Sequence, residues 1–158
     1  MDMLFILHPQ HTAFDFAGPA EVIHMAAQAG APFRLRVAGP QAECVNSLGV
    51  INRVDPLPET LADGTLVFLL GTEDEPRDYA TPAALAIIDW LQAQFDPARH
   101  RLACICSGAL LAARAGLLDG RRCTTHHALI EMLRDWAPRA QVLENRMFVE
   151  DGSVFTSA

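Results

Sequence analysis

Apolar residues along the chain fall into two kinds of segment. Short apolar runs of strand length occur at Met3–Leu7, Leu66–Leu70 and Leu102–Cys106. Between them lie longer stretches with helical spacing of apolar residues, such as the one that ends at Gly30. The run from Phe33 to Ala38 alternates and predicts a further strand. Strands and helices in this alternating order predict βαβ units and a parallel sheet.

Capping residues predict where the helices begin and end. Pro19 suits the first turn of a helix, so we expect the first helix to begin near Asp15 and to end at Gly30. Thr81 is the expected N-cap of a second helix, with Pro82 just inside it. The remaining expected elements are an edge strand or hairpin around residues 50–54, a strand at Arg122–Thr125, a helix at His127–Trp136, and strands at Val142–Val149 and Ser153–Thr156.

One stretch passes from strand to helix with almost no loop between. The run Leu102–Cys106 is followed by Ser107-Gly108 and then by ALLAARAG, a helix-forming sequence that ends at Gly116. Such a junction holds one residue at a sharp turn above the carboxyl edge of the sheet, as in a nucleophile elbow. Here that residue is Cys106, and the N–H groups of a helix start favour its thiolate form. The alternative is a plain buried cysteine, because free cysteine is among the most buried residue types.

Composition excludes several classes of protein. The 158-residue chain has 12 Lys and Arg against 19 Asp and Glu, a net charge of −7, so direct nucleic-acid binding is not expected. It has no run of 18 apolar residues that would span a membrane, and its start, MDMLFIL, lacks the features of a signal peptide. The four cysteines, at 44, 104, 106 and 123, form no CxxC pair, so we expect reduced thiols and a cytoplasmic location. The length is that of one domain, over residues 1–158.

Chemically active side chains follow the carboxyl ends of several expected strands. In an open α/β sheet, ligands bind at that edge. A thiol, an imidazole and a carboxyl group are what nucleophilic chemistry needs, with Cys106 as nucleophile and Asp15 or His126 moving protons. The N–H groups of Ser107 and Gly71 are candidates for an oxyanion hole. The full set of candidates is His8, Asp15, Gly71, Thr72, Cys106, Ser107 and His126.

Each assignment has an alternative. Asp15 is also suited to capping the first helix, His126 to bonding a backbone carbonyl at a strand end, and His8 to a loop without contact to a ligand. A zinc ion held by Cys106, His126 and Asp15 is disfavoured because these ligands are scattered along the sequence. We therefore expect no metal and no cofactor.

Three motifs, in order, resemble a known superfamily. The segment LACICSGALLAARAGLLDGRRCTTHHAL, with Cys106 and His126, resembles the elbow-to-histidine region of the ThiJ/PfpI superfamily, which has the class I glutamine amidotransferase-like fold. FDFAGPAEV, with Asp15, resembles the first-helix start of the subgroup that carries Asp-x-x-Gly-Pro-x-Glu-Val, and FVEDGSVFTSA resembles the tail of that subgroup. The resemblance covers nearly the whole chain and implies a flavodoxin-like three-layer α/β sandwich with a mostly parallel sheet.

The subgroup has two kinds of member, and their residue roles carry over by resemblance. One is the isonitrile hydratase type, a cysteine-dependent enzyme. The other is the N-terminal ligand-sensing domain of AraC-type transcription regulators, which a helix-turn-helix DNA-binding domain follows. The paired His126-His127 and the tail are more similar to the regulators. Cys106 takes the place of the elbow cysteine, Asp15 that of the acid facing it, His126 that of the histidine after the Thr-Thr pair, and Gly71 that of the glycine whose N–H faces the elbow.

The resemblance favours the sensing domain of an AraC-type regulator, which binds a small metabolite near Cys106. The alternatives are a cysteine-dependent hydratase or amidohydrolase and a redox sensor in which Cys106 is oxidised. Members continue with further helices after the Thr-Ser-Ala tail, so we expect a C-terminally shortened member that reaches DNA only through a domain absent here. A homodimer is implied by analogy. One departure is Gly71-Thr72, where many members have Gly-Gly.

Overall fold

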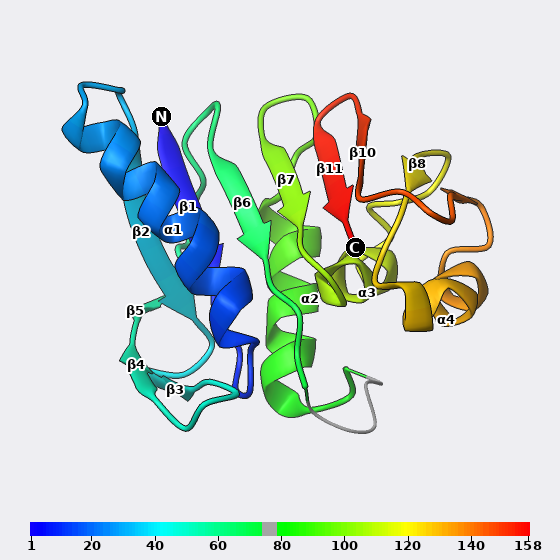
Figure 1. The fold of residues 1–158 in the computed structure, drawn as a ribbon, viewed down its shortest axis with the longest axis horizontal. Coiled ribbons are helices and arrows are strands. Elements are labelled where there is room, and N and C mark those ends of the chain that lie inside the picture. The colour runs from blue at the N-terminus through cyan, green and yellow to red at the C-terminus, as the bar shows by residue number, and fades with distance from the viewer. Residues whose placement is uncertain (74–78) are drawn as a thin grey trace.

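The computed structural model describes residues 1–73 and 79–158, and their centre is a seven-stranded sheet. The strand order is β10-β11-β7-β6-β1-β2-β5 (Figure 1). Its strands are β1 (Asp2–Ile6), β2 (Arg34–Gly39), β5 (Asp55–Pro56), β6 (Leu66–Leu69), β7 (Arg101–Cys104), β10 (Phe148–Asp151) and β11 (Val154–Ser157). Neighbouring strands are parallel, except for the antiparallel pair β10 and β11. The expected α/β fold with a mostly parallel sheet is confirmed.

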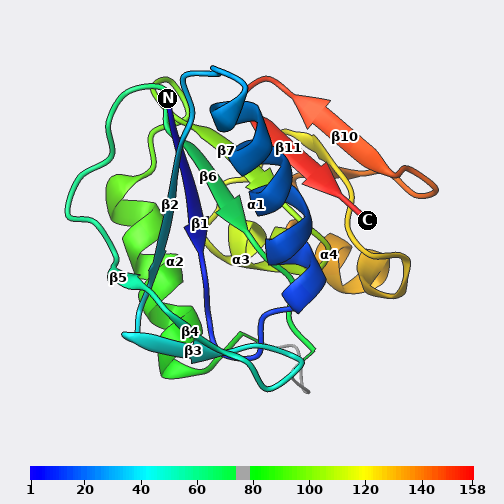
Figure 2. The same ribbon diagram turned by 60° about the vertical axis from the view of Figure 1, so that its left-hand side comes forward.

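Helices lie on both faces of this sheet. The helices are α1 (Ala13–Gln28), α2 (Pro82–Gln94), α3 (Gly108–Arg114) and α4 (Ile130–Trp136). α1 crosses one face, while α2, α3 and α4 lie on the other (Figures 1 and 2). Successive strand residues point to opposite faces, so Met3 and Phe5 join the core beneath α1, whereas Leu4 and Ile6 join the core shared with α2 and α3. The three layers agree with the flavodoxin-like sandwich that the resemblance implies.

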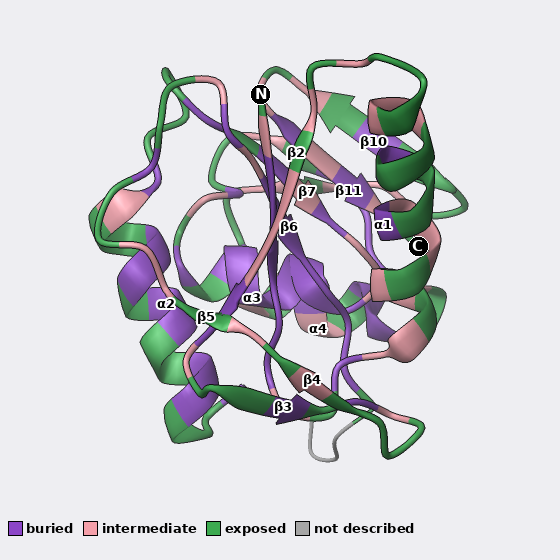
Figure 3. Ribbon diagram, turned by 90° about the vertical axis from the view of Figure 1, so that its left-hand side faces the viewer, coloured by how far each residue is buried: buried purple, intermediate pink, exposed green. Residues whose placement is uncertain are grey.

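The two faces are covered unequally. In the described part of the chain, α1 is the one helix on its face, and much of its outer side is exposed (Figure 3). Farther from α1, three side chains on or next to β7 and β11 are only partly buried: Ala103, Ile105 and Phe155. The opposite face is closed more completely, with Leu102 and Cys104 fully or almost fully buried.

Two short sheets lie outside the central one. β3 (Glu43–Val45) and β4 (Ile51–Arg53) form an antiparallel hairpin, which is one of the two forms expected for this region. β8 (Arg122–Cys123) pairs with β9 (Gln141–Val142) in a sheet of its own, so the strand expected at Arg122–Thr125 is present but ends at Cys123, and it lies outside the central sheet. The backbone leaves that strand at Thr124, whose N–H donates to the Thr156 hydroxyl of β11 at 2.8 Å.

Two further boundaries differ from expectation. The predicted strand Val142–Val149 is broken between β9 and β10, where Asn145 has a φ of 53°. α1 begins at Ala13, so Pro19 lies inside the helix instead of in its first turn. The helix can begin this early because the Ser47 hydroxyl accepts a hydrogen bond from the Ala13 N–H at 3.1 Å, which satisfies one of the free donors of the first turn.

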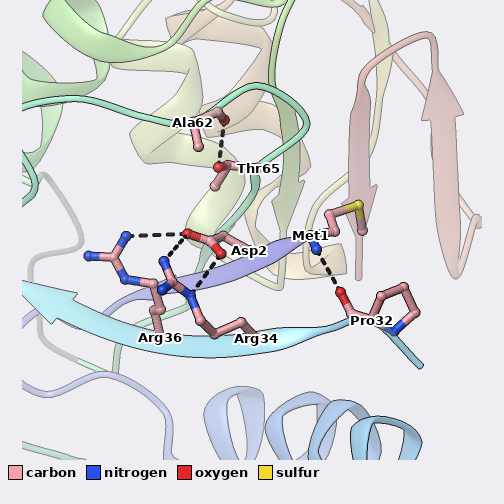
Figure 4. A network of polar contacts seen from close by, with 7 residues as sticks. All are labelled: Met1, Asp2, Pro32, Arg34, Arg36, Ala62 and Thr65. Carbon is pink, nitrogen blue, oxygen red and sulfur yellow. Dashed lines mark hydrogen bonds and ion pairs between the residues drawn. The ribbon is translucent and has the colours of Figure 1, made fainter. Parts of the chain in front are cut away.

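Polar contacts join β1 and β2 at the amino end of the sheet (Figure 4). Asp2 lies 2.8 Å from Arg34 and 3.4 Å from Arg36. The Arg34 guanidinium, followed by that of Arg36, lowers the pKa of Asp2, although partial burial opposes them. The terminal amino group of Met1 donates to the Pro32 carbonyl at 2.6 Å. These contacts fix the register of the two strands at the edge opposite Cys106.

Candidate functional site

Cys106 occupies a strained turn between β7 and α3. Its φ is 53°, in the left-handed region that residues other than glycine seldom adopt. The start of α3 lies very close to the end of β6, because a Cβ on Gly108 would lie 2.4 Å from the carbonyl oxygen of Leu69. The Ile105 N–H donates to that same oxygen at 2.9 Å, which holds the junction against the end of β6. The sharp strand-to-helix turn expected at Cys106 is therefore present.

Asp15 and Cys106 both adjoin Gly71. Asp15 lies in the first turn of α1, and its Oδ2 accepts a hydrogen bond from the Gly71 N–H at 3.1 Å. A Cβ on Gly71 would lie 2.7 Å from that oxygen, 3.0 Å from the Cβ of Cys106 and 3.1 Å from the hydroxyl of Ser107. The N-cap of α1 is Thr12, so the alternative that Asp15 only caps the helix does not hold. Gly71 thus lets a carboxyl group, a thiol-bearing residue and a hydroxyl pack closely around one backbone position.

The surroundings of Asp15 favour its neutral form. Burial is the largest effect and raises the pKa of its carboxyl group above the usual value, and the negative charge of Glu73 raises it further. The hydrogen bond from Gly71 acts in the opposite direction but is the weaker effect. A raised pKa keeps a larger fraction of the carboxyl group protonated at a given pH, which favours a role in moving protons.

Ser107 connects the elbow to two neighbouring segments. Its side chain is fully buried, and its hydroxyl accepts a hydrogen bond from the Thr72 N–H at 2.9 Å. The Tyr79 hydroxyl lies 3.0 Å from both the Ser107 hydroxyl and the Ser107 carbonyl oxygen. The Thr72 hydroxyl donates to the Gln10 carbonyl at 3.1 Å. The side chains of Ser107 and Thr72 therefore bind other parts of the protein.

His126 lies on a segment that is attached to the elbow. The hydroxyl of the preceding residue, Thr125, donates to the Cys106 carbonyl at 2.8 Å. The Nδ1 atom of His126 accepts a hydrogen bond from the Ala128 N–H at 3.3 Å, and its ring lies 4.2 Å from that of His127. With Nδ1 as acceptor, a neutral His126 carries its proton on Nε2. In that tautomer the imidazole presents a donor at Nε2 instead of a base.

Two histidines lie buried beside the site. His8 follows β1, with Nδ1 2.8 Å from the Pro9 carbonyl oxygen and Nε2 3.3 Å from that of Leu70. The His8 ring is 5.9 Å from that of Tyr79 and 6.4 Å from that of His11. His11 is completely buried, and burial lowers the pKa of its imidazole, although a hydrogen bond to the His8 carbonyl opposes this. Within the described residues, His11 Nε2 has no hydrogen-bond partner.

Cys106 differs from the other three cysteines in its exposure. Cys44, Cys104 and Cys123 are buried, whereas Cys106 is only partly buried. Burial raises the pKa of the thiols of Cys44 and Cys104, and burial together with the charge of Asp151 raises that of Cys123 to about 11. A thiol with a raised pKa is a poor nucleophile at neutral pH. Cys106 is therefore the most exposed of the four cysteines, and the other three are poor nucleophiles.

Sequence reasoning passed over Tyr79 and Thr125. Tyr79 follows residues 74–78, which lie outside the described part of the chain. The available signal was that it is the one tyrosine in the sequence. Thr125 precedes His126 in a Thr-Thr pair, which was the available signal. In the same described part of the chain, no three His, Cys, Asp or Glu side chains are grouped to hold a metal ion, so Cys106 and Asp15 form no such cluster with His126.

A hollow lies next to the segment that carries Thr125 and His127. It has a volume of about 360 Å³ and is bounded by the start of α4, the segment before β10 and the chain end. Its lining includes Thr125, His127, Glu131, Glu144 and Met147. Cys106, Asp15 and Gly71 are not part of that lining. These three elbow residues therefore lie outside the hollow.

Comparison with known proteins assigns the chain to a family. The model of the DJ-1/PfpI family matches residues 1–158. The chain belongs to this family. It is 32% identical over 113 residues to an uncharacterised protein of the cpoL 5′ region of Streptomyces lividans, covering 71% of this chain and 77% of that protein. The resemblance of its motifs to the ThiJ/PfpI superfamily is thereby confirmed.

Other relatives of this DJ-1/PfpI chain are regulators. It is 31% identical over 159 residues to the HTH-type transcriptional regulator CdhR of Pseudomonas aeruginosa, covering 99% of this chain and 46% of CdhR. The chain thus spans about half the length of that regulator. The crystal structure of an AraC family transcriptional regulator from Pseudomonas putida has the same fold, with a TM-score of 0.79 and 21% identity, covering 99% of this chain and 83% of that one. Among the described residues, none of the helices has the length and apolar character needed to cross a membrane.

Proposed function

We propose that the chain is the ligand-sensing part of an AraC-type transcription regulator, and that it binds a small metabolite at the elbow. The observation that carries this proposal is the arrangement around Gly71. A side chain at position 71 would collide with the Asp15 carboxyl group and with Cys106, so Gly71 is what lets these two groups lie close together. A site of this kind offers a ligand one carboxyl group, one thiol and the backbone of the turn.

The engagement of the Gly71 N–H supports binding over acyl transfer. An oxyanion hole needs backbone N–H groups that are directed at the developing charge. Here the Gly71 N–H donates to Asp15, so it would have to exchange this partner before it could stabilise an oxyanion. A bound ligand that bonds to Asp15 requires no such exchange.

The relatives and the charge of the chain support the regulatory role. CdhR is named an HTH-type transcriptional regulator, and this chain matches less than half of its length. With a net charge of −7, the present residues are poorly suited to contacting DNA directly. We infer that DNA binding, where it occurs, belongs to a segment outside these 158 residues.

A ligand screen tests the proposal. The chain is expected to show saturable thermal stabilisation by at least one member of a panel of small polar metabolites, without turnover of that compound. Asp15→Leu, which cannot bond to the ligand, is expected to lose the stabilisation, while Phe148→Glu on distant β10 is expected to keep it. Equal stabilisation of wild type and Asp15→Leu by every active compound would place the binding site elsewhere.

A cysteine-dependent hydratase is the second candidate. The raised pKa of Asp15 favours it, because a neutral carboxyl group can donate a proton to a substrate that Cys106 attacks. In that case isonitriles or small amides would be consumed by the wild type, and Cys106→Ala would abolish turnover while its melting temperature stayed close to that of the wild type. Absence of turnover across both compound classes would exclude this candidate in favour of the sensor.

A further inference from the structure

His11 is a buried histidine in the loop that joins β1 to α1. Its side chain is 0% exposed, and its Nδ1 atom lies 2.9 Å from the carbonyl oxygen of His8. A carbonyl oxygen only accepts hydrogen bonds, so Nδ1 carries the proton, and the lone pair of the neutral ring is on Nε2. Nε2 is buried as well and has no hydrogen-bond partner among the described residues. The ring of Phe16, on α1, lies 6.2 Å from the His11 ring. These surroundings suit an uncharged imidazole.

The backbone around His11 ties three other segments together. The His11 carbonyl accepts a hydrogen bond at 3.0 Å from the Ser47 N–H, in the turn between β3 and β4. The Thr12 N–H donates to the Gly71 carbonyl at 3.0 Å, just after the end of β6. α1 begins directly after Thr12, and the hairpin lies beside this start (Figure 2). The loop therefore fixes where the first turn of α1, and with it the carboxyl group of Asp15, lies against Gly71.

One residue of this loop is held in a strained conformation. Gln10 has a φ of 60°, in the left-handed region that seldom holds a residue with a side chain. Its N–H donates to the Val45 carbonyl at 2.7 Å, and its own carbonyl accepts from the Thr72 hydroxyl at 3.1 Å. Such a conformation persists only while the surrounding contacts hold it. Loss of a contact would therefore favour a rearrangement of the loop.

We propose that His11 makes this loop, residues 7–12, a pH-sensitive latch. At neutral pH the uncharged ring is packed in place and the latch is closed. A proton added at Nε2 would turn this atom into a donor that has no acceptor among the described residues. It would also place a positive charge in a buried site, and both effects are costly. The cost is avoided when the loop opens and the ring reaches water, so acid releases the start of α1 from Gly71. The proposal does not depend on any ligand.

The pH range of the latch follows from the burial of His11. Burial lowers the pKa of its imidazole below the ordinary value of 6.5, although the bond to the His8 carbonyl opposes this. In the open loop the ring is in water, and its pKa returns toward 6.5. Above that value both states are unprotonated, so opening gains nothing. Below it the open state takes up the proton first, and its population rises by up to about tenfold for each pH unit until the lowered pKa is reached.

The titratable groups on the adjoining segments do not relieve this cost. Asp15 of α1 has a raised pKa, so its carboxyl group becomes neutral as the pH falls. Glu73, which follows β6, is exposed to water, and burial raises the pKa of the Cys44 thiol of β3, which stays uncharged. His8 has a carbonyl oxygen 2.8 Å from Nδ1 and another 3.3 Å from Nε2, an arrangement that suits its protonated form. A positive charge on His8 would repel one on His11, whose ring is 6.4 Å away.

Hydrogen exchange of the Thr12 N–H tests the latch, because this group bonds to Gly71 only while the loop is closed. NMR follows it between about pH 7.5 and 5, with correction for the intrinsic exchange rate. The protection factor of the wild type is expected to fall by roughly tenfold or more below pH 6.5. His11→Phe keeps a ring that cannot be protonated and is expected to remove the fall, while His24→Gln, at an exposed histidine of α1, is expected to keep it. An unchanged wild-type protection factor, or a fall that persists in His11→Phe, would overturn the proposal.

The His11 ring itself provides a second test, which needs no substitution at that position. In an NMR titration of the wild type, the His11 imidazole is expected to titrate below its ordinary value of 6.5, together with a change in the amide signal of Gly71. Asp15→Asn is expected to keep both changes, which separates the proton on His11 from one on Asp15. A His11 ring that titrates at or above 6.5, or one that titrates without any change at Gly71, would show that the loop is no latch.

Discussion

The Oδ2 atom of Asp15 accepts a hydrogen bond from the Gly71 N–H at 3.1 Å, across 56 positions of the sequence. This bond ties the first turn of α1 to the end of β6, directly beside the turn that holds Cys106. Neither residue could serve the site alone, because the carboxyl group reaches the elbow only where position 71 lacks a side chain. The Asp15–Gly71 pair is therefore the basis of the binding site that we propose.

Replacing Asp15 by Asn should stabilise the fold while harming the site. Burial and Glu73 raise the pKa of this carboxyl group, so keeping it ionised at neutral pH costs stability. Asn retains an oxygen acceptor for Gly71 without the charge, and we expect a gain on the order of 1 kcal/mol in the free energy of unfolding at pH 7. Below the ordinary value of 3.8 both states of the wild type are protonated, so the gain should vanish there. Urea unfolding at pH 7 and pH 3 measures both.

Asp2→Asn is the control with the opposite sign. Arg34 lowers the pKa of Asp2, so its carboxylate stabilises the fold above the ordinary value of 3.8, and this stabilisation is lost as the pH falls through the lowered pKa. Asp2→Asn should therefore destabilise the chain at neutral pH, and less so in acid. If the two substitutions shift the urea midpoint in the same direction at pH 7, the electrostatic account of Asp15 fails.

Cys106 should react with alkylating agents before the other cysteines. It is partly exposed, while Cys44, Cys104 and Cys123 are buried with raised thiol pKa values. Brief iodoacetamide treatment followed by peptide mass spectrometry should find the label at position 106. Cys106→Ser should leave the folded chain almost unlabelled. Prior labelling of Cys44 in the wild type would show that the elbow sulfur is less accessible than the structure indicates.

Thr125 should support the strained turn. Its hydroxyl is the donor to the Cys106 carbonyl at 2.8 Å. Thr125→Val removes the donor from a buried position, and we expect a loss of about 1–3 kcal/mol in the free energy of unfolding together with altered alkylation of Cys106. Thr125→Ser keeps the hydroxyl and should behave like the wild type in the alkylation assay. If Thr125→Ser alters the alkylation of Cys106 as much as Thr125→Val does, the hydroxyl is not what supports the turn.

Gly108, at the start of α3, and Gly116, just after its end, are required to be glycine for different reasons. A Cβ on Gly108 would lie 2.4 Å from a backbone oxygen of β6, whereas Gly116 has open space but a φ of +77°. Gly108→Ala should therefore cost several kcal/mol or prevent folding, because backbone would have to move. Gly116→Ala should cost only about 1–2 kcal/mol of left-handed strain. Thermal unfolding of both variants checks the ranking, and a larger loss for Gly116→Ala would contradict it.

The elbow could be predicted because its determinants are local. A buried run that changes within two residues into a helix, with a glycine at the closest approach, places Cys106 at the turn. The α1–β2 unit and the start of α2 at Thr81 and Pro82 were predicted for the same reason, since periodicity and capping residues act over a few positions. The central sheet followed from the alternation of strands and helices.

The parts that failed depend on contacts distant in the sequence. Pro19 suggested a late helix start, but Ser47, on another segment, supplies the partner that lets α1 begin at Ala13. β8 is diverted from the central sheet because Thr124 bonds to Thr156 instead. Tyr79 reaches Ser107 from a polar stretch of sequence that carries no periodic signal. Such pairings are invisible to patterns read along one segment.

Binding of a ligand from the thermal screen to Gly71→Ala tests the central claim most directly. The added methyl group would lie 2.7 Å from the Asp15 carboxyl oxygen and 3.0 Å from the Cys106 Cβ, so it would push the groups of the proposed site apart without altering any charge. Isothermal titration calorimetry should show binding at least about tenfold weaker in Gly71→Ala, while Gly18→Ala, a glycine with room for a methyl group, should bind like the wild type. Equal affinity of wild type and Gly71→Ala, with both folded, would contradict a ligand site at the elbow.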